Sequence, residues 1–237
     1  MHAFDSVTGR SSYRSSKLPS LDETEESPSL RGLVERYPTL HCVTADLASA
    51  SHVLLRCFSS GGTLFLCGNG GSMADALHMS GELLKAYAHP RVLPDQLRAR
   101  LAAQPDGELL TRNLQPGLPA VVLGVNPSVA SAVANDMRDP GMNLAQELLA
   151  LARPGDVLLG LSTSGEARNV LYAAQTATAL DLTVIAFTGE SGGRLASLAD
   201  VAVCVPAGRA DRVQELHVAC YHALCEMLEM TFFVHTP

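Results

Sequence analysis

The sequence has few basic residues and no run of them. Its 237 residues include 17 lysines and arginines against 24 aspartates and glutamates, for a formal net charge of −7. Without a basic patch, broad binding to nucleic acid or to a membrane surface is disfavoured. A phosphorylated ligand of such a chain has to be held largely by backbone N–H groups and hydroxyls, because cationic side chains are scarce.

Long apolar runs and paired cysteine motifs are also missing. No apolar run approaches the roughly 20 residues of a membrane span, and the N-terminus lacks a secretory pattern. The six cysteines show no C-x-x-C spacing, which is typical of reduced thiols in a protein core. We therefore expect a soluble, cytoplasmic protein.

The chain is nonetheless apolar enough, at 47%, to bury one good core. Residues 1–30 are rich in Ser, Pro, Asp and Glu and are predicted to form a flexible leader. Residues 31–237 are predicted to form one domain. From Pro38, apolar residues recur at spacings of three and four, which predicts an amphipathic helical extension reaching about Ser60. Its apolar stripe would pack on the core or on another subunit.

Five short apolar runs alternate with helical patterns along the rest of the chain. The runs are Thr63–Cys67, Ala120–Val125, Asp156–Leu161, Leu182–Phe187 and Val201–Val205. The helical stretches cover about 72–87, 128–152, 167–181, 190–198 and 209–231. Because the runs are almost continuously apolar, both faces of each strand should be covered. The order predicts an α/β fold: a doubly wound, five-stranded parallel sheet.

One connection, residues 88–119, is too long for an ordinary crossover. It contains five prolines and two helical pieces, Asp95–Gln104 and Gly107–Leu114. Connections of this length are usually functional or disordered. We expect an inserted segment that either covers the ligand crevice or packs against a neighbouring subunit.

Two turns rich in glycine or serine follow predicted strands. The first, in Phe65–Ser72, and the second, in Leu159–Gly165, each lead into a helix. In a parallel sheet both turns lie at the carboxyl edge, where helix N-termini present free N–H groups and a positive dipole end. Hydroxyls at these turns add further donors. The pair of turns predicts a binding site for a phosphorylated small molecule.

Titratable side chains follow on the predicted helices. His78 and Glu82 lie one helical turn apart, a spacing that suits two ligands of one metal or an acid/base couple, although surface pairs of this kind are common. Gln214 and His222 are eight residues apart, about 12 Å of helical rise. Either the last helix bends, or only one of these two binds, or two subunits share the site.

Other polar residues admit an ordinary structural interpretation. Asn135–Asp136 are expected to end a helix after the second strand, and a helix stop and a contact at the edge of the crevice are equally good explanations. Asp211 is expected to cap the last helix. His217 is expected on a polar face with Arg212 and Glu215.

Five ordered blocks together resemble the phosphoheptose isomerase family of the SIS (sugar isomerase) superfamily. The blocks are Cys67–Ser72, Ala76–Glu82, Asn135–Asp136, Gly155–Gly165 and Asp211–His217, followed by His222. The likeness covers about residues 35–232 and leaves 88–119 unmatched.

The resemblance implies a homotetramer with active sites at subunit interfaces, often with zinc bound. Such an enzyme would convert sedoheptulose 7-phosphate to D-glycero-D-manno-heptose 7-phosphate, with Glu82 as the base on carbon and His222 as the acid/base on oxygen. The implied metal ligands are His78, Glu82, Gln214 and His222. The implied substrate contacts are Asn69, Gly70, Gly71, Ser72, Glu82, Asn135, Asp136, Ser162, Thr163, Ser164 and Gln214.

The chain departs from the family at Glu166 and Ala167, where Asn and Ser are common. One hydroxyl donor is lost, and a carboxylate stands near the site expected for a phosphate dianion. Two other hypotheses stay open. One is a non-catalytic SIS module that senses a sugar phosphate or binds a protein partner, and the other is an isomerase of a different sugar phosphate.

Overall fold

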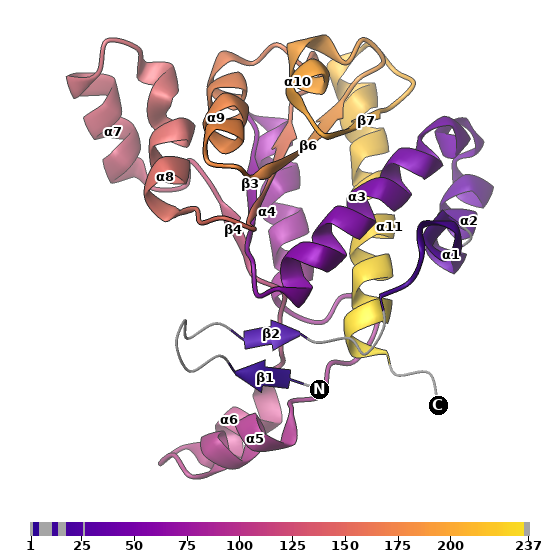
Figure 1. The fold of residues 1–237 in the computed structure, drawn as a ribbon, viewed down its shortest axis with the longest axis vertical. Coiled ribbons are helices and arrows are strands. Elements are labelled where there is room, and N and C mark those ends of the chain that lie inside the picture. The colour runs from indigo at the N-terminus through magenta and orange to yellow at the C-terminus, as the bar shows by residue number, and fades with distance from the viewer. Residues whose placement is uncertain (1, 5–10, 14–17, 26, 235–237) are drawn as a thin grey trace.

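A five-stranded parallel sheet forms the centre of the computed structural model, which describes residues 2–4, 11–13, 18–25 and 27–234 (Figure 1). The strand order is β4-β3-β5-β6-β7, with every neighbouring pair parallel. The strands are β3 (Leu64–Cys67), β4 (Ala120–Val122), β5 (Val157–Leu161), β6 (Thr183–Thr188) and β7 (Val201–Cys204). The predicted doubly wound α/β fold is confirmed.

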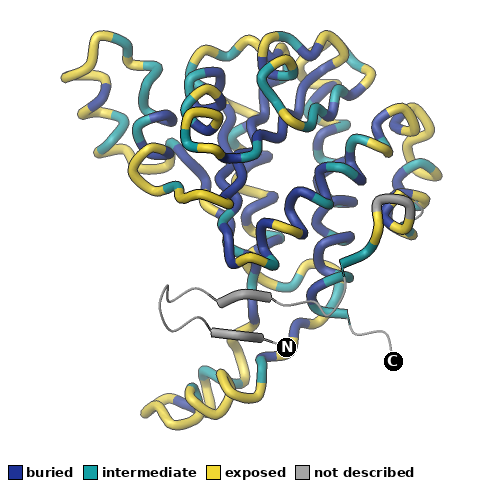
Figure 2. The backbone as a smooth tube through the Cα atoms, in the orientation of Figure 1, coloured by how far each residue is buried: buried dark blue, intermediate teal, exposed yellow. Residues whose placement is uncertain are grey.

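Helices cover both faces of the sheet. One face carries α3 (Thr44–Ser59), α4 (Gly71–Leu84) and α11 (Ala210–Phe233), and the other carries α8 (Asn143–Leu151), α9 (Arg168–Ala179) and α10 (Gly193–Leu198). Within β3, Leu64 and Leu66 join the first core, whereas Phe65 and Cys67 join the second. This two-sided burial explains why the strands lack a polar face (Figure 2).

The N-terminal helical extension begins earlier than expected. Helix α2 (Pro28–Arg36) starts inside the predicted leader, because the Ser27 hydroxyl accepts a hydrogen bond from the N–H of Leu30 and Pro28 fits the first helical turn. Leu30 is buried in the core shared with α11. Of the leader predicted for residues 1–30, residues 1, 5–10, 14–17 and 26 lie outside the described residues.

Several element boundaries differ from those expected. Before α2 lie β1 (His2–Phe4), β2 (Ser11–Tyr13) and α1 (Leu21–Glu25). The helix expected from Pro38 is a 3-10 turn, η1 (Pro38–Val43), followed by α3. The stretch expected at 128–152 is split into α7 (Pro127–Asp136), η2 (Pro140–Met142) and α8. Pro140 accounts for the split, because the residue before a proline is pushed into the extended conformation that Asp139 adopts.

The inserted segment leaves and rejoins the chain at the C-terminal end of α4. Its two ends are joined there, since the N–H of Leu118 donates to the Leu83 carbonyl oxygen at 2.9 Å. Between them α5 (Asp95–Ala102) and α6 (Gly107–Asn113) form a hairpin that projects from the body of the molecule (Figure 1). The glycine-rich turn is at the opposite end of α4, so this arrangement does not support a cover over that turn.

Among the described helices, none combines the length and hydropathy that crossing a membrane would require.

Candidate active site

The two predicted phosphate-binding turns lie side by side at the carboxyl edge of the sheet. The first joins β3 to α4 and the second joins β5 to α9, and β3 and β5 are neighbours at the point where the strand order reverses. Glycine is required in both. A Cβ at Gly68 would lie 2.6 Å from the Ser72 carbonyl oxygen, and Gly165 has φ +66° with the Gly192 carbonyl oxygen 2.0 Å from a built Cβ.

An amide pair that the sequence reasoning missed ties the two turns together. Each side-chain NH₂ of Asn69 and Asn169 donates to the other's carbonyl oxygen at 2.8 Å. Asn69 belongs to the predicted substrate contacts, whereas Asn169 lies in the first turn of α9. In the sequence, Asn169 is marked only by its position at the start of the helix that follows the second turn.

The carboxylate of Glu166 is paired with Arg194, in the first turn of α10. It accepts hydrogen bonds from the backbone N–H and from Nε of Arg194, at 2.8 and 2.6 Å. These Arg194 bonds hold the pKa of Glu166 below its usual value, so the group is ionised. The departure from the family at this position therefore adds an ion pair between the second turn and α10, and the carboxylate is not left as an uncompensated charge.

The predicted metal and acid/base residues meet where α4 and α11 run side by side (Figure 1). His78 Nε2 lies 3.1 Å from Glu82 Oε1 and 3.4 Å from His222 Nε2. One donor atom from each of the three residues lies within 4.8 Å of the others, an arrangement that could hold a metal ion. Burial, with His78 nearby, lowers the pKa of His222 below its usual value, which favours the neutral imidazole.

A second layer behind His78 was not predicted. The Tyr221 hydroxyl lies 2.9 Å from His78 Nδ1 and 3.5 Å from the Asp75 carboxylate. Burial and the nearby Asp75 raise the pKa of Tyr221 well above its usual value, so the phenol keeps its proton. A phenol that donates to Asp75 accepts from His78 Nδ1–H, which leaves Nε2 free to face Glu82 and His222. Asp75 could have been suspected from its position one turn before His78.

Gln214 lies apart from this cluster in the single chain. Its side-chain amide packs against Gly71, where a Cβ would come within 2.5 Å of Nε2. Helix α11 is unbroken from Ala210 to Phe233, so Gln214 and His222 are about 12 Å apart in helical rise.

Asn135 and Asp136 are likewise not joined to the turns or to the cluster within one chain. They are exposed at the end of α7, and their side chains bond to each other at 2.7 Å. Figure 1 places α7 at the outer edge of the molecule, beyond α8 and away from α11.

Two structural expectations for the last helix are wrong. His217 is fully buried, packs against Phe187 and donates its Nε2–H to the Thr188 carbonyl oxygen, 3.1 Å away, instead of joining a polar face. Asp211 lies inside the first turn and pairs with Arg209, which occupies the capping position. His217 is buried because its face of α11 packs against β6, and Asp211 lies inside the helix because α11 begins at Ala210. The local sequence specifies neither.

Comparison with known proteins agrees with this architecture. The family model described as "SIS domain" matches residues 137–233, so this part of the chain, which includes the second turn and α11, is an SIS domain. "Phosphoheptose isomerase" of Shewanella sp. (strain ANA-3) is 35% identical over 191 residues, which cover 79% of this chain and 84% of the relative. The chain belongs to the phosphoheptose isomerase family, and the resemblance inferred from its motif blocks is confirmed.

Solved structures show the same likeness. Phosphoheptose isomerase from Neisseria gonorrhoeae aligns with a TM-score of 0.65 at 30% identity, over 85% of this chain and 92% of that one. Phosphoheptose isomerase from Francisella tularensis aligns with a TM-score of 0.67 at 27% identity, over 90% and 100% of the two chains. The sugar isomerase domain of an RpiR transcription factor from Sphaerobacter thermophilus, at 16% identity and TM-score 0.52, shares the fold alone.

Proposed function

We propose that this protein isomerises sedoheptulose 7-phosphate, a ketose, to the aldose D-glycero-D-manno-heptose 7-phosphate. The observation that carries the proposal is the meeting of His78, Glu82 and His222 on the same pair of helices that begin at the carboxyl edge of the sheet. Gly71, at the start of α4, and His78 are separated by about 10 Å of helical rise. One extended sugar phosphate can therefore have its anionic end at the turns and its carbonyl end at the cluster.

The phosphate would be held by the N-termini of α4 and α9. Their free backbone N–H groups and the positive ends of two helix dipoles favour an anion. Added donors come from the hydroxyls of Ser72, Ser162, Thr163 and Ser164. Anchoring the distant phosphate fixes the reacting carbons by position, which lowers the entropic part of the barrier.

The reaction needs one base that moves a proton between C1 and C2, and one group that carries a proton between O1 and O2. Glu82 takes the proton from C1, and the electron pair of that C–H bond forms the C1=C2 double bond as charge moves to O2. Neutral His222 then takes the O1 proton and delivers it to O2. Glu82 returns its proton to C2 while O1 becomes the aldehyde oxygen, so one proton has moved between carbons and one between oxygens.

The three clustered side chains fit a zinc ion in donor type, since imidazole nitrogens and a carboxylate oxygen are its usual ligands. His78, Glu82 and His222 would hold it, and Gln214 of a second copy would add a fourth ligand. A bound zinc supplies Lewis-acid polarisation of the carbonyl group. The Tyr221–Asp75 pair supports this use, because it fixes the His78 tautomer that presents Nε2.

We further propose that the enzyme is a cytoplasmic homotetramer whose active sites lie between subunits. Leu77 and Leu84, on the helix that carries Glu82, are 49% and 51% exposed, and a second copy of the chain would cover them. An interface would also let Gln214, Asn135 and Asp136 reach a site in a neighbouring chain. No disulfide joins any of the six cysteines, all of which lie in the described part of the chain, and this fits a reducing compartment.

The test is turnover of sedoheptulose 7-phosphate in D₂O, followed by NMR. We expect the aldose product with deuterium at C2, because the proton on Glu82 exchanges with solvent before it returns. Glu82→Gln should reduce kcat by about 10²-fold or more while still binding the substrate. If the unaltered protein binds the substrate without turning it over, with and without added zinc, the proposal is contradicted and a non-catalytic sugar-phosphate sensor is favoured. If the protein turns over only another sugar phosphate, it is an isomerase and the proposed substrate is wrong.

A further inference from the structure

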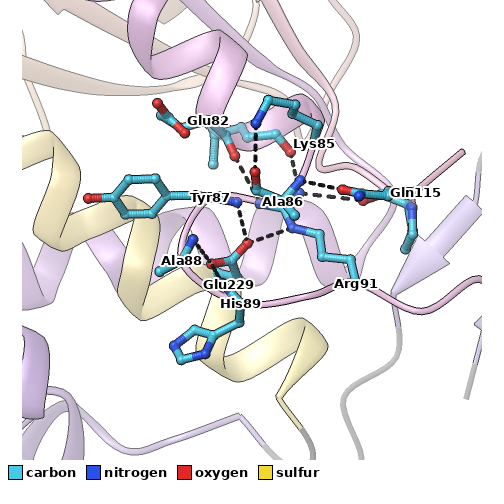
Figure 3. Close-up of polar contacts among 11 residues, drawn as sticks. Glu82, Lys85, Ala86, Tyr87, Ala88, His89, Arg91, Gln115 and Glu229 are labelled. Atoms are coloured by element: carbon cyan, nitrogen blue, oxygen red, sulfur yellow. Dashed lines mark hydrogen bonds and ion pairs between the residues drawn. The ribbon is translucent and has the colours of Figure 1, made fainter. Parts of the chain in front are cut away.

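The chain that follows α4 folds back onto α11 and is held there by Glu229. This side chain is fully buried, and its carboxylate accepts four hydrogen bonds of 2.7–2.8 Å (Figure 3). The donors are the backbone N–H groups of Tyr87, Ala88 and His89 and Nε of Arg91. Burial alone would raise the pKa of Glu229, but these four donors hold that pKa below its usual value. The group is therefore a buried carboxylate with every donor supplied by one short segment.

Arg91 connects this carboxylate to the end of the helix that carries Glu82. Its side chain is 1% exposed, and its two terminal nitrogens donate to the carbonyl oxygens of Leu83 and Glu82 at 2.7 and 2.8 Å. These carbonyls have no partner within the helix, because they belong to its last turn. A guanidinium at this point satisfies them and complements the negative end of the helix dipole. The Phe233 ring covers the guanidinium at 4.4 Å.

The same segment places an aromatic ring on the other proposed acid/base residue. Tyr87, whose N–H is fixed by Glu229, stacks on His222 with ring centroids 5.4 Å apart and an interplanar angle of 14°. His78 and Tyr221 meet the His222 ring edge-on, at 4.9 and 5.0 Å. Tyr87 is thus the residue that covers a face of the imidazole.

We propose that Tyr87, Arg91 and Glu229 are positioning residues for the isomerase site. Arg91 fixes the backbone of Glu82, and Glu229 fixes Tyr87 against the ring of His222. The inference rests on the proposed function, since it assigns no contact with substrate to any of the three. It gives Tyr87 and the first part of the inserted segment a role at the active site, whereas the α5–α6 hairpin beyond carries none of the three residues.

Tyr87 offers the sharpest test because its contact with His222 is made by the ring. We expect Tyr87→Ala to lower kcat by roughly 10- to 100-fold, since small displacements of a reacting group cost rates of this order. KM should stay within about twofold, because the phosphate turns are untouched. Tyr87→Phe keeps the ring and should retain at least half of kcat. Leu109→Ala, which truncates an exposed apolar residue of the same inserted segment, is the matched control and should be fully active.

A second readout does not depend on turnover. The ring current of Tyr87 should shift the NMR signals of the His222 imidazole, and these signals should move in Tyr87→Ala but little in Tyr87→Phe. Arg91→Lys keeps the positive charge but loses the planar guanidinium group, which bonds at once to Glu229 and to the carbonyl oxygens of Leu83 and Glu82. This variant should therefore also lower kcat more than it raises KM.

The outcomes separate the two proposals. If the unaltered protein is an active isomerase and Tyr87→Ala is fully active too, the positioning role is overturned and the proposed function stands. Equal losses of kcat in Tyr87→Ala and Tyr87→Phe would have the same meaning. An unaltered protein with no isomerase activity would overturn the proposed function and the positioning role with it. If Arg91→Lys fails to fold, the two Tyr87 variants still decide the matter.

Discussion

Replacing His217 should remove a large part of the acid sensitivity of this protein. The imidazole is fully buried on α11, with Nε2 at the Thr188 carbonyl oxygen and Nδ1 without a hydrogen-bond partner in the described part of the chain. Burial lowers the pKa of His217 from 6.5 to about 4, against the opposing effect of the Thr188 carbonyl. The neutral form with its proton on Nε2 therefore fits the folded state, and the charged form does not.

The sign and size of the effect follow from these two pKa values. Between about pH 6.5 and pH 4 the unfolded chain binds a proton at His217 that the folded chain does not, so folding stability falls as the pH falls. The loss from this residue alone is about 2 kcal/mol at about pH 5 and approaches about 3 kcal/mol below pH 4, at 1.36 kcal/mol per pKa unit.

Urea unfolding at about pH 7.5 and about pH 5, at fixed protein concentration, measures this loss. His217→Gln is the matched variant, because its side chain does not titrate and can still donate to Thr188. It should be less stable than the unaltered protein at the higher pH yet lose about 2 kcal/mol less between the two. Equal losses in the two proteins would refute the reasoning.

Three further predictions concern the turns and the cluster. Ser162→Ala should raise KM for the sugar phosphate by roughly tenfold and leave kcat within about threefold, because a buried hydroxyl bond to a charged group is lost; an unchanged KM would remove Ser162 from the phosphate site. Gly165→Ala should lower the free energy of unfolding by at least about 2 kcal/mol, since φ is +66° and a Cβ would meet Gly192. The control Gly32→Ala, in an open helical position, should raise the free energy of unfolding by up to about 1 kcal/mol. Zinc added after chelation should raise the thermal midpoint of the unaltered protein and not of His78→Ala, and equal shifts would place the ion elsewhere.

The fold was predictable because its signals are local. Continuous apolar runs of strand length, separated by helical periodicity, indicate a parallel sheet covered on both faces, and the structure has it. The turns at Phe65–Ser72 and Leu159–Gly165 were found for the same reason, as was the one-turn spacing of His78 and Glu82. The boundaries of these elements were inexact, as in the break before α8 that Pro140 imposes, and Arg209 takes the capping position expected for Asp211.

The rest could not be predicted because it depends on contacts between distant parts of the chain. Glu229 meets its donors 138 to 142 residues earlier in the chain, and nothing near it in sequence indicates those partners. The contact of Tyr221 with His78 spans 143 residues, and that of Asn69 with Asn169 spans 100. Whether a polar side chain is buried, and which groups it bonds to, depends on the residues that surround it in the folded chain.

One sugar-phosphate molecule is proposed to span the phosphate turns and the His78–Glu82–His222 cluster. A crystal structure of the Glu82→Gln variant soaked with sedoheptulose 7-phosphate would show whether it does. We expect the phosphate at Ser162–Ser164 and Ser72, with C1 and C2 beside residue 82 and a copy of His222. A phosphate bound away from both turns, or a sugar whose C1–C2 end points away from the cluster, would contradict it.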